Sequence, residues 1–415
     1  MKIVVTHPTG NRNLRAVLSS FEEAGLLAEF STTVAVDADN FFLKLLPEKY
    51  KTELNRRTYP INFDKVRTHP LLELSRNILP KIGLKDAVRH EHGFASVDKV
   101  YNDLDHRTGV QLKTSAKKAG TDAVYAYEDG ALHSFTAAKQ VGLTCFYDLP
   151  IGYWRAASRL LKAEQERWPE YAATLTGLRN STEKLERKDE ELKLADKIYV
   201  ASSFTALTLK DFPGELCEVE VIPYGFPPVL KDRVYADAAN RPLKLLFVGG
   251  LSQRKGIADL FAAVKNIGDG VELTVVGRKT SAECPALDAA LKEHNWIPSL
   301  PHEEILKLMQ VNDVLVFPSL FEGFGLVITE AMSQGTPVIT TDRTAGPDLI
   351  THGLNGWIVE AGSTNALQKQ IESLLKQPEL IAAAGKAAME TAKLRPWTKY
   401  GTELCESVVN YLKKA

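Results

Sequence analysis

The stretch PSLFEGFGLVITEAMSQG, residues 318–335, constrains the fold more than any other part of the sequence. An apolar run precedes it, glycines at 323 and 325 form a turn, and residues 326–333 have the composition of a helix. A buried strand, a glycine turn and a helix in direct succession are typical of an α/β fold. Such a turn directs free backbone N–H groups and the positive end of the helix dipole at one place, which favours an anion.

Two carboxylates bracket this turn. Glu322 comes directly before the first glycine, and Glu330 lies in the predicted helix. Carboxylates repel phosphate, but their oxygens accept hydrogen bonds from the hydroxyl groups of ribose or a hexose. The stretch therefore predicts a ligand that is part anion and part polyol, as a sugar nucleotide is. The alternative is that the glycines only cap a helix and Glu322 is solvated.

A second glycine turn, GGLSQRKG, follows the apolar run at residues 243–248. It contains Gly249 and Gly250, and then Arg254 and Lys255. The two cations can neutralise a diphosphate, the arginine as a two-pronged donor and the lysine as a point charge. The alternative is a solvated basic helix start, although cations are unfavourable at a helix N-terminus unless an anion is bound.

Strand and helix patterns alternate along the whole chain, which predicts parallel, doubly wound sheets. We expect a second strand at residues 31–36, and long helices at 154–194 and 371–392. Residues 225–242, with three prolines, read as a linker between two domains. Further strands are predicted at residues 2–5, 122–127, 143–147, 196–201, 218–222, 272–276, 314–317, 337–340 and 356–359.

Composition excludes several classes of protein. The chain has 415 residues and a net charge of -1, so it lacks the basic character of a nucleic-acid-binding protein. Its four cysteines lie far apart and indicate neither a zinc site nor a disulfide framework. The N-terminus lacks the apolar core of a signal peptide, and no run is long enough to span a bilayer. These features favour a cytoplasmic protein.

Three weaker signals lie in the first half. The loop after the first strand carries Gly10 and Asn11 and faces either a ligand or only solvent. Asp37 and Asp39 form a DxD pair that either holds a divalent metal or, as we favour, caps a helix. Residues 41–89 are basic, with one apolar helical face. They form either a surface for an anionic membrane or acceptor, or, as we favour, a solvated insertion.

The segments GGLSQRKG, GRK at Gly277, PSLFEGFGLVITEAMSQGTPVI and AGPDLITHGLNGWIV together resemble the family 4 glycosyltransferases of the GT-B fold. The resemblance implies an α/β protein of two Rossmann-like domains that face a cleft. Residues 1–225, with a helical insertion at about 40–118, would bind the acceptor. Residues 243–396 would bind the nucleotide sugar, and a last helix at 397–415 would return to the first domain.

The resemblance also implies roles for individual residues. Arg254 and Lys255 would bind the donor diphosphate, Glu330 the ribose hydroxyls, and Glu322 the transferred sugar. The backbone near Leu300 would meet the base. The full donor-binding set implied in this way is Gly249, Gly250, Arg254, Lys255, Gly277, Arg278, Leu300, Glu322, Gly323, Phe324, Gly325, Leu326 and Glu330.

The implied reaction is transfer of a sugar with retention at the anomeric carbon, without a metal or other cofactor. The acceptor would be a saccharide or lipid-linked acceptor of envelope polysaccharide synthesis, reached at the inner face of the membrane. Arg254, Lys255, Glu322 and Asp148 are the candidate catalytic residues. Asp148 stands where many relatives carry a histidine, and it either orients a hydroxyl or caps a helix. Glu128 joins Gly10, Asn11 and Asp148 as an N-terminal candidate for acceptor contact.

Two other functions remain open at this point. A sugar-nucleotide epimerase of the same fold would form product without an acceptor. A degenerate subunit would bind nucleotide without transferring or hydrolysing it, and the absent histidine motivates this alternative.

Overall fold

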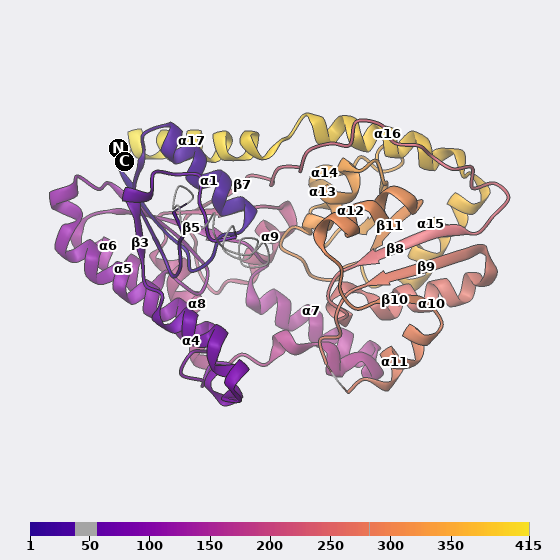
Figure 1. The fold of residues 1–415 in the computed structure, drawn as a ribbon, viewed down its shortest axis with the longest axis horizontal. Helices are drawn as coiled ribbons and strands as arrows, with labels where there is room; N and C mark the ends of the chain where they lie inside the picture. The colour runs from indigo at the N-terminus through magenta and orange to yellow at the C-terminus, as the bar shows by residue number, and fades with distance from the viewer. Residues whose placement is uncertain (38–55, 282, 415) are drawn as a thin grey trace.

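The computed structural model describes residues 1–37, 56–281 and 283–414. Two parallel sheets organise it, one in each half of the chain (Figure 1). The first has seven strands in the order β3-β2-β1-β4-β5-β6-β7, and the second has six in the order β10-β9-β8-β11-β12-β13. In each sheet the strand order runs outward in both directions from the strand that comes first in the chain, β1 or β8. This is the doubly wound arrangement that the sequence predicted.

The strands of the first sheet are β1 (Ile3–Thr6), β2 (Leu27–Thr32), β3 (Val66–Thr68), β4 (Ala123–Tyr127), β5 (Thr144–Leu149), β6 (Lys197–Val200) and β7 (Glu218–Val221). Those of the second are β8 (Leu243–Val248), β9 (Val271–Val276), β10 (Asn295–Ile297), β11 (Val314–Phe317), β12 (Val338–Thr341) and β13 (Trp357–Val359). The central strands, such as β1, β4 and β11, are buried throughout, because helices cover both faces of each sheet.

The helices of the first half are α1 (Arg12–Glu23), α4 (Leu71–Ile78), α5 (Val97–Ala119), α6 (Leu132–Val141), α7 (Trp154–Arg167), α8 (Thr182–Leu194) and α9 (Ser203–Thr208). Those of the second half are α10 (Ile257–Ile267), α11 (Pro285–Lys292), α12 (His302–Val311), α13 (Leu326–Ser333), α14 (Gly346–Leu349), α15 (Thr364–Lys376), α16 (Glu379–Lys393) and α17 (Trp397–Lys414).

Several predicted elements differ from those observed. The predicted helix 154–194 is two helices, because Pro169 has no N–H group and a 3₁₀ segment begins there. Pro378 divides the predicted helix 371–392 into α15 and α16 in the same way. The second strand lies at 27–32 rather than 31–36. The insertion at about 40–118 is not wholly helical, since it supplies the edge strand β3. Its predicted apolar face at 41–46 lies outside the described residues.

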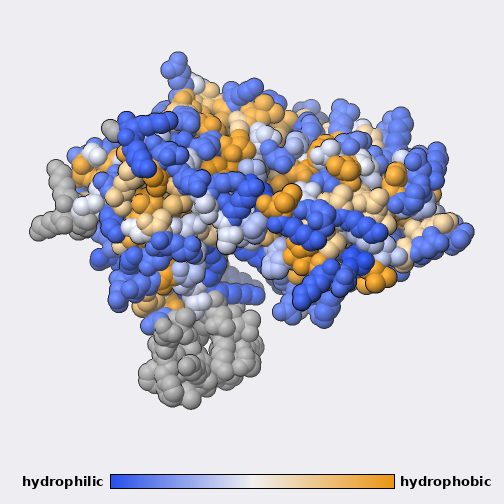
Figure 2. All heavy atoms as spheres, turned by 90° about the horizontal axis from the view of Figure 1, so that it is seen from above, coloured by the Kyte–Doolittle hydropathy of each residue, from blue (hydrophilic) through white to orange (hydrophobic). Residues whose placement is uncertain are grey.

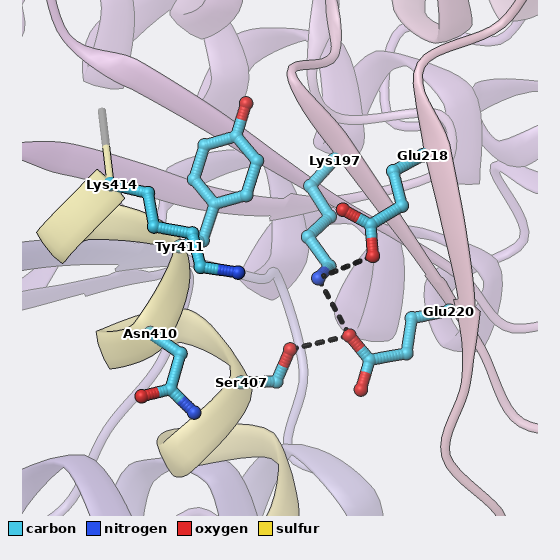
Figure 3. A pocket seen from close by; sticks show the side chains of 7 residues that line it. All are labelled: Lys197, Glu218, Glu220, Ser407, Asn410, Tyr411 and Lys414. Atoms are coloured by element: carbon cyan, nitrogen blue, oxygen red, sulfur yellow. Dashed lines mark hydrogen bonds and ion pairs between the residues drawn. The ribbon is translucent and has the colours of Figure 1, made fainter.

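Helix α17 crosses back from the second half and lies along α1, as the yellow ribbon at the top of Figure 1 shows. Leu404 and Val408 bury their side chains in the shared core. The Ser407 hydroxyl donates to Glu220 at 2.5 Å, beside Lys197, which pairs with that carboxylate at 2.6 Å (Figure 3). Seen from above, polar side chains cover most of this face and apolar ones lie in small groups between them (Figure 2).

Both connections between the halves pass through one place. The backbone N–H of Phe226, in the linker, donates to the carbonyl of Arg395 at 2.8 Å. The Arg395 side chain in turn donates to the carbonyl of Pro223 and pairs with Glu403 of α17 at 2.6 Å. The linker and the return crossing are therefore bonded to each other side by side.

Candidate functional site

Two of the predicted loops meet at the carboxyl edge of the second sheet. Gly249 and Gly250 follow β8, and Gly277 and Arg278 follow β9, its parallel neighbour. A short 3₁₀ segment, Gln253–Lys255, then carries the two predicted cations. Parallel strands end at one edge of a sheet, so the glycine turns and the cations lie at the edge where ligands bind in open α/β sheets.

The turn between β11 and α13 reaches the same edge. Gly325 is the N-cap of α13 and has a φ of +91°, a left-handed conformation that favours glycine. No side chain caps this helix, so the N–H groups of its first residues, beginning with Leu326, are available to an anion. Phe324 is buried beneath the turn, against the ring of Tyr224 at 4.9 Å.

Arg254 and Lys255 both contact Glu322. The Arg254 guanidinium lies 3.3 Å from the Glu322 carboxylate and donates to the Phe321 carbonyl at 2.7 Å. The Lys255 ammonium pairs with the same carboxylate and lies 4.7 Å from the centre of the Phe317 ring. Two cations share one anion, so the group keeps one positive charge.

Burial and charge compete at this cluster. Burial lowers the pKa of Lys255, and the charge of Glu322 opposes that shift. Burial acts to raise the pKa of Glu322, but the charges of Lys255 and Arg254 outweigh it and hold that pKa below its usual value. Glu322 is therefore ionised at neutral pH, as a carboxylate that accepts from sugar hydroxyls must be.

Glu330 lies on α13, where it meets the start of α12 and a side chain from the first half. Its carboxylate is 3.7 Å from Nδ1 of His302, and the Arg12 guanidinium donates to Nε2 of the same ring at 3.1 Å. With Nε2 as acceptor, the ring proton sits on Nδ1 and faces Glu330. Burial raises the pKa of Glu330 to about 7, and the charge of Arg12 opposes that shift.

The glycine turn also touches the first half directly. A Cβ atom at Gly323 would lie 2.0 Å from the Pro150 carbonyl oxygen, so only glycine allows this approach. The Gly323 carbonyl accepts hydrogen bonds from the hydroxyls of Ser202 at 2.6 Å and Thr205 at 2.9 Å. The turn predicted to hold the sugar is therefore packed against the loop that follows β5.

The N-terminal candidates are placed differently. Asp148 is 2% exposed and its carboxylate accepts from the Tyr125 hydroxyl at 2.7 Å. Burial raises the pKa of Asp148 to about 7, and the Tyr125 hydrogen bond opposes the shift. Glu128 is also buried and pairs with Lys188 at 3.0 Å. Both carboxylates are committed to partners inside the first domain, and their contact with an acceptor stays a prediction.

Gly10 and Asn11 lie together in the loop after β1. The Asn11 side chain caps α1 by accepting from the Leu14 N–H at 2.9 Å. A Cβ atom at Gly10 would lie 2.6 Å from the Tyr59 ring, so that loop is packed on one side. Arg12, the next residue, is the one that reaches the second half.

Asp37 is described but Asp39 is not, so the DxD pair cannot be placed as a unit. In residues 1–37, 56–281 and 283–414, His, Cys, Asp and Glu side chains form no group of three that could hold a metal. Across the same residues, no helix is both long and apolar enough to cross a bilayer.

Comparison with known proteins identifies the second half. Residues 231–391, which include every cation, glycine turn and carboxylate described for the second sheet, match the family model of glycosyl transferases group 1. Residues 231–391 are a group 1 glycosyl transferase domain. The predicted family 4 membership is consistent with this match and with the relatives below.

Curated relatives of this glycosyltransferase include the glycogen synthase of Mycobacterium tuberculosis, 26% identical over 295 residues, 68% of each chain. The amylovoran biosynthesis glycosyltransferase AmsK of Erwinia amylovora is 28% identical over 194 residues, 42% of this chain and 47% of its own. The chain thus covers two thirds of the first relative but under half of the second.

Solved structures share the architecture over the whole chain. Sucrose-phosphate synthase from Thermosynechococcus elongatus superposes with a TM-score of 0.67 at 19% identity, and covers 100% of both chains. The Anabaena protein HepE, crystallised in complex with UDP-glucose, gives 0.63 at 16% identity, over 99% of this chain and 100% of its own. These likenesses support the predicted GT-B fold for this glycosyltransferase.

Sequence reasoning missed Arg12 and His302. Each stands at the first position of a helix, α1 and α12, and neither belongs to a glycine turn. The signal that could have found them is their place directly after loops already suspected of facing a ligand, at Gly10–Asn11 and at Leu300. Their pairing with each other depends on how the halves face one another, which the sequence does not state.

Proposed function

We propose that this glycosyltransferase moves a sugar from a nucleotide diphosphate sugar to an acceptor with retention at the anomeric carbon. The observation that carries the proposal is the convergence of Arg254 and Lys255 with Glu322, beside the uncapped N-terminus of α13. Cations and free N–H groups suit the diphosphate, and the carboxylate suits the sugar. The complex of HepE with UDP-glucose is consistent with such a donor.

The barrier to transfer is the separation of charge between an oxocarbenium-like sugar and the departing diphosphate. Arg254, Lys255 and the helix terminus are fixed where the negative charge would grow, and fixed charges of this kind usually make the largest contribution to catalysis. A departing phosphate oxygen can take the proton of the acceptor hydroxyl. The reaction then needs no side-chain base and no metal or other cofactor.

Glu322 has two roles in this scheme. Without donor, it neutralises Lys255, which is otherwise a buried and unpaired cation. When the diphosphate arrives, its oxygens take over the two cations, and the carboxylate is released to accept hydrogen bonds from the sugar. The buried cations therefore have an anionic partner both before binding, in Glu322, and after it, in the diphosphate.

Glu330 would hold the ribose hydroxyls, with His302 and Arg12 beside it. Arg12 comes from the first half, so its contact with His302 would link the first half to a nucleotide bound at the second. We further propose a saccharide or lipid-linked acceptor of envelope polysaccharide synthesis, in line with relatives such as AmsK. The cytoplasmic side of a membrane is the corresponding location.

A thermal-shift screen tests the donor. Samples with UDP, GDP, ADP or TDP and their sugars, with and without EDTA, should show one selective shift that EDTA leaves unchanged. Ligand at about 100 times its Kd adds ~2.7 kcal/mol of stability. Lys255→Met should reduce the shift, while Lys265→Met, which changes an exposed lysine on α10, should keep it. No shift with any nucleotide would refute the proposal, and a shift lost in EDTA would make it metal-dependent.

The same samples separate the alternatives. With the donor identified, NMR of the product reports whether the anomeric configuration is retained. A product that forms without acceptor would indicate an epimerase, and nucleotide binding without transfer or hydrolysis would indicate a degenerate subunit.

A further inference from the structure

Exposed apolar side chains gather on one part of the first domain. Large apolar side chains are scattered singly over most protein surfaces, but a contiguous group of them marks a contact site. Seven of them fall between residues 71 and 97, each at least 46% exposed. We call this group the α4 surface: Leu71, Leu74, Ile78, Ile82, Leu84, Phe94 and Val97.

The spacing of these residues makes a continuous stripe. Leu71, Leu74, Ile78 and Ile82 follow one another at intervals of three or four residues, through α4 and the 3₁₀ turn Leu79–Ile82. That interval keeps side chains on one face of a helix. In Figure 1, α4 lies at the lower edge of the first half, away from α17 and the second sheet.

The one acid of α4 is turned away from this stripe. The side chain of Glu73 is 2% exposed and pairs with Arg57 at 2.7 Å and Arg76 at 2.8 Å. Burial acts to raise the pKa of Glu73, but its arginine partners outweigh burial and lower that pKa. An ionised carboxylate is thus held inside, so α4 presents no negative charge beside its apolar face.

Cations border the same stripe. Lys81, Lys85 and Arg89 are exposed, and none of them has an ion-pair partner among the residues that the structure describes. Asp86 is the one exposed acid among them. The Phe94 loop is fixed beside these cations, because the N–H of Gly93 donates to the Arg89 carbonyl at 2.8 Å. Apolar side chains and unpaired cations therefore share one surface.

We infer that the α4 surface docks on an anionic lipid bilayer. A helix with exposed apolar residues on one face and basic residues beside them lies in the interface of such a membrane. The apolar side chains enter the headgroup boundary, while Lys81, Lys85 and Arg89 contact anionic headgroups. Neutral lipid carries no net negative charge to attract these cations, so the charge complementarity selects the anionic bilayer.

Docking there would bring the first domain close to lipid-linked acceptors. This consequence rests on the proposed function. Helix α4 follows β3 at the carboxyl edge of the first sheet, the edge at which the acceptor is expected. Membrane contact itself needs neither donor nor acceptor. It can therefore be tested separately.

The test is sedimentation of the full chain with vesicles of phosphatidylcholine alone or mixed in equal parts with phosphatidylglycerol. We expect binding to the mixed vesicles that weakens with salt. Lys81→Glu with Lys85→Glu should lower the partition coefficient at least ~25-fold, since each cation near such a surface contributes about fivefold. Leu74→Ser with Ile78→Ser should abolish binding. The nucleotide shift should stay unchanged in both, so failure here is distinguishable from failure of the proposed function.

The matched control is Lys369→Glu with Lys386→Glu, two exposed lysines of the second half, and it should bind as the wild type does. A wild type that stays in solution with mixed vesicles, or binds neutral vesicles equally well, overturns the inference. So does a control that loses as much binding as the α4 variants. Sedimentation velocity without lipid tests a second copy as occupant, and a dimer that Leu74→Ser with Ile78→Ser abolishes would also overturn it.

Discussion

The carboxyl edges of the two sheets carry similar residue types in opposite states. At the second sheet, Glu322 contacts cations that a diphosphate could replace, and α13 begins without a side-chain cap. At the first sheet, Asp148 and Glu128 are buried and bonded to Tyr125 and Lys188. The charges of the second edge can thus exchange partners, whereas those of the first edge bond one strand to the next and to helix α8. A carboxylate at a strand end is a ligand-binding group only where its partner can be displaced.

The largest effect should come from the cations of the second sheet. Lys255→Met, or Arg254→Ala, should raise the barrier to transfer by about 2.7–4 kcal/mol, a loss of 10²–10³ in kcat. Initial rates at saturating donor measure this, with Lys265→Met as the matched control. If either variant retained the wild-type kcat, the proposal that the diphosphate replaces Glu322 as the partner of Arg254 and Lys255 would be wrong.

The next effect concerns Glu330, whose pKa burial raises to about 7. Ribose hydroxyls donate to an ionised carboxylate, so the affinity for nucleotide should fall as the pH drops below about 7. Glu330→Gln should bind roughly 10- to 100-fold more weakly at pH 8, because hydrogen bonds to charged groups contribute about 1.5–3 kcal/mol. Calorimetric titrations from pH 5.5 to 8.5 measure both effects. A variant that keeps the wild-type pH profile would assign the titration to another group.

The third prediction concerns Asp148, at the carboxyl edge of the first sheet. Its folded pKa of about 7 lies above the usual value for an unfolded aspartate, so the folded state retains a proton that the unfolded state releases. The contribution of Asp148 to the free energy of unfolding should therefore fall by about 1.4 kcal/mol per pH unit between pH 4 and 7. Asp148→Asn should lose this contribution while Glu191, whose pKa burial raises to about 8, keeps its own.

Urea denaturation across that pH range measures the stability of Asp148→Asn, and its transfer rate decides the role of the residue. A structural role leaves kcat within about tenfold of wild type, whereas an essential catalytic group costs 10²-fold or more. The second result would show that the first edge also takes part in chemistry, and the contrast would fail.

The smallest effect should come from Arg12, a side chain of the first half that contacts His302 of the second. Arg12→Ala removes a hydrogen bond to His302 worth about 0.5–1.5 kcal/mol, so the KM for donor should rise roughly 2- to 10-fold with kcat little changed. His302→Ala should give the same change, and the double variant should add nothing further. Additive effects would mean that the two residues act separately.

The sequence predicted the strand and helix of the glycine turn at the second edge correctly, because they are contiguous in the chain. A strand, a glycine turn and a helix within some twenty residues determine where Gly325, Glu322 and Glu330 lie. The first edge is assembled from strand ends that are far apart in the chain. Whether Asp148 is open or buried depends on Tyr125, one strand away, and the sequence pattern does not encode that. The strand β3 was missed because its three residues, Val66, Arg67 and Thr68, include one apolar side chain, whereas the equally short β13 is apolar throughout.

The hydrogen bond between Phe226 and Arg395 has a mechanical consequence. The chain connects the two halves twice, and this bond ties both connections together at one point. Non-covalent contacts between the halves, such as that of Ser202 with Gly323, can break, whereas the two covalent connections stay. A rotation between the halves would therefore turn about this point, and a small rotation there becomes a large displacement at the far ends. Movements between the two edges would thus depend on a few residues beside Pro223, and its neighbour Tyr224 packs against Phe324 in the turn that would hold the sugar.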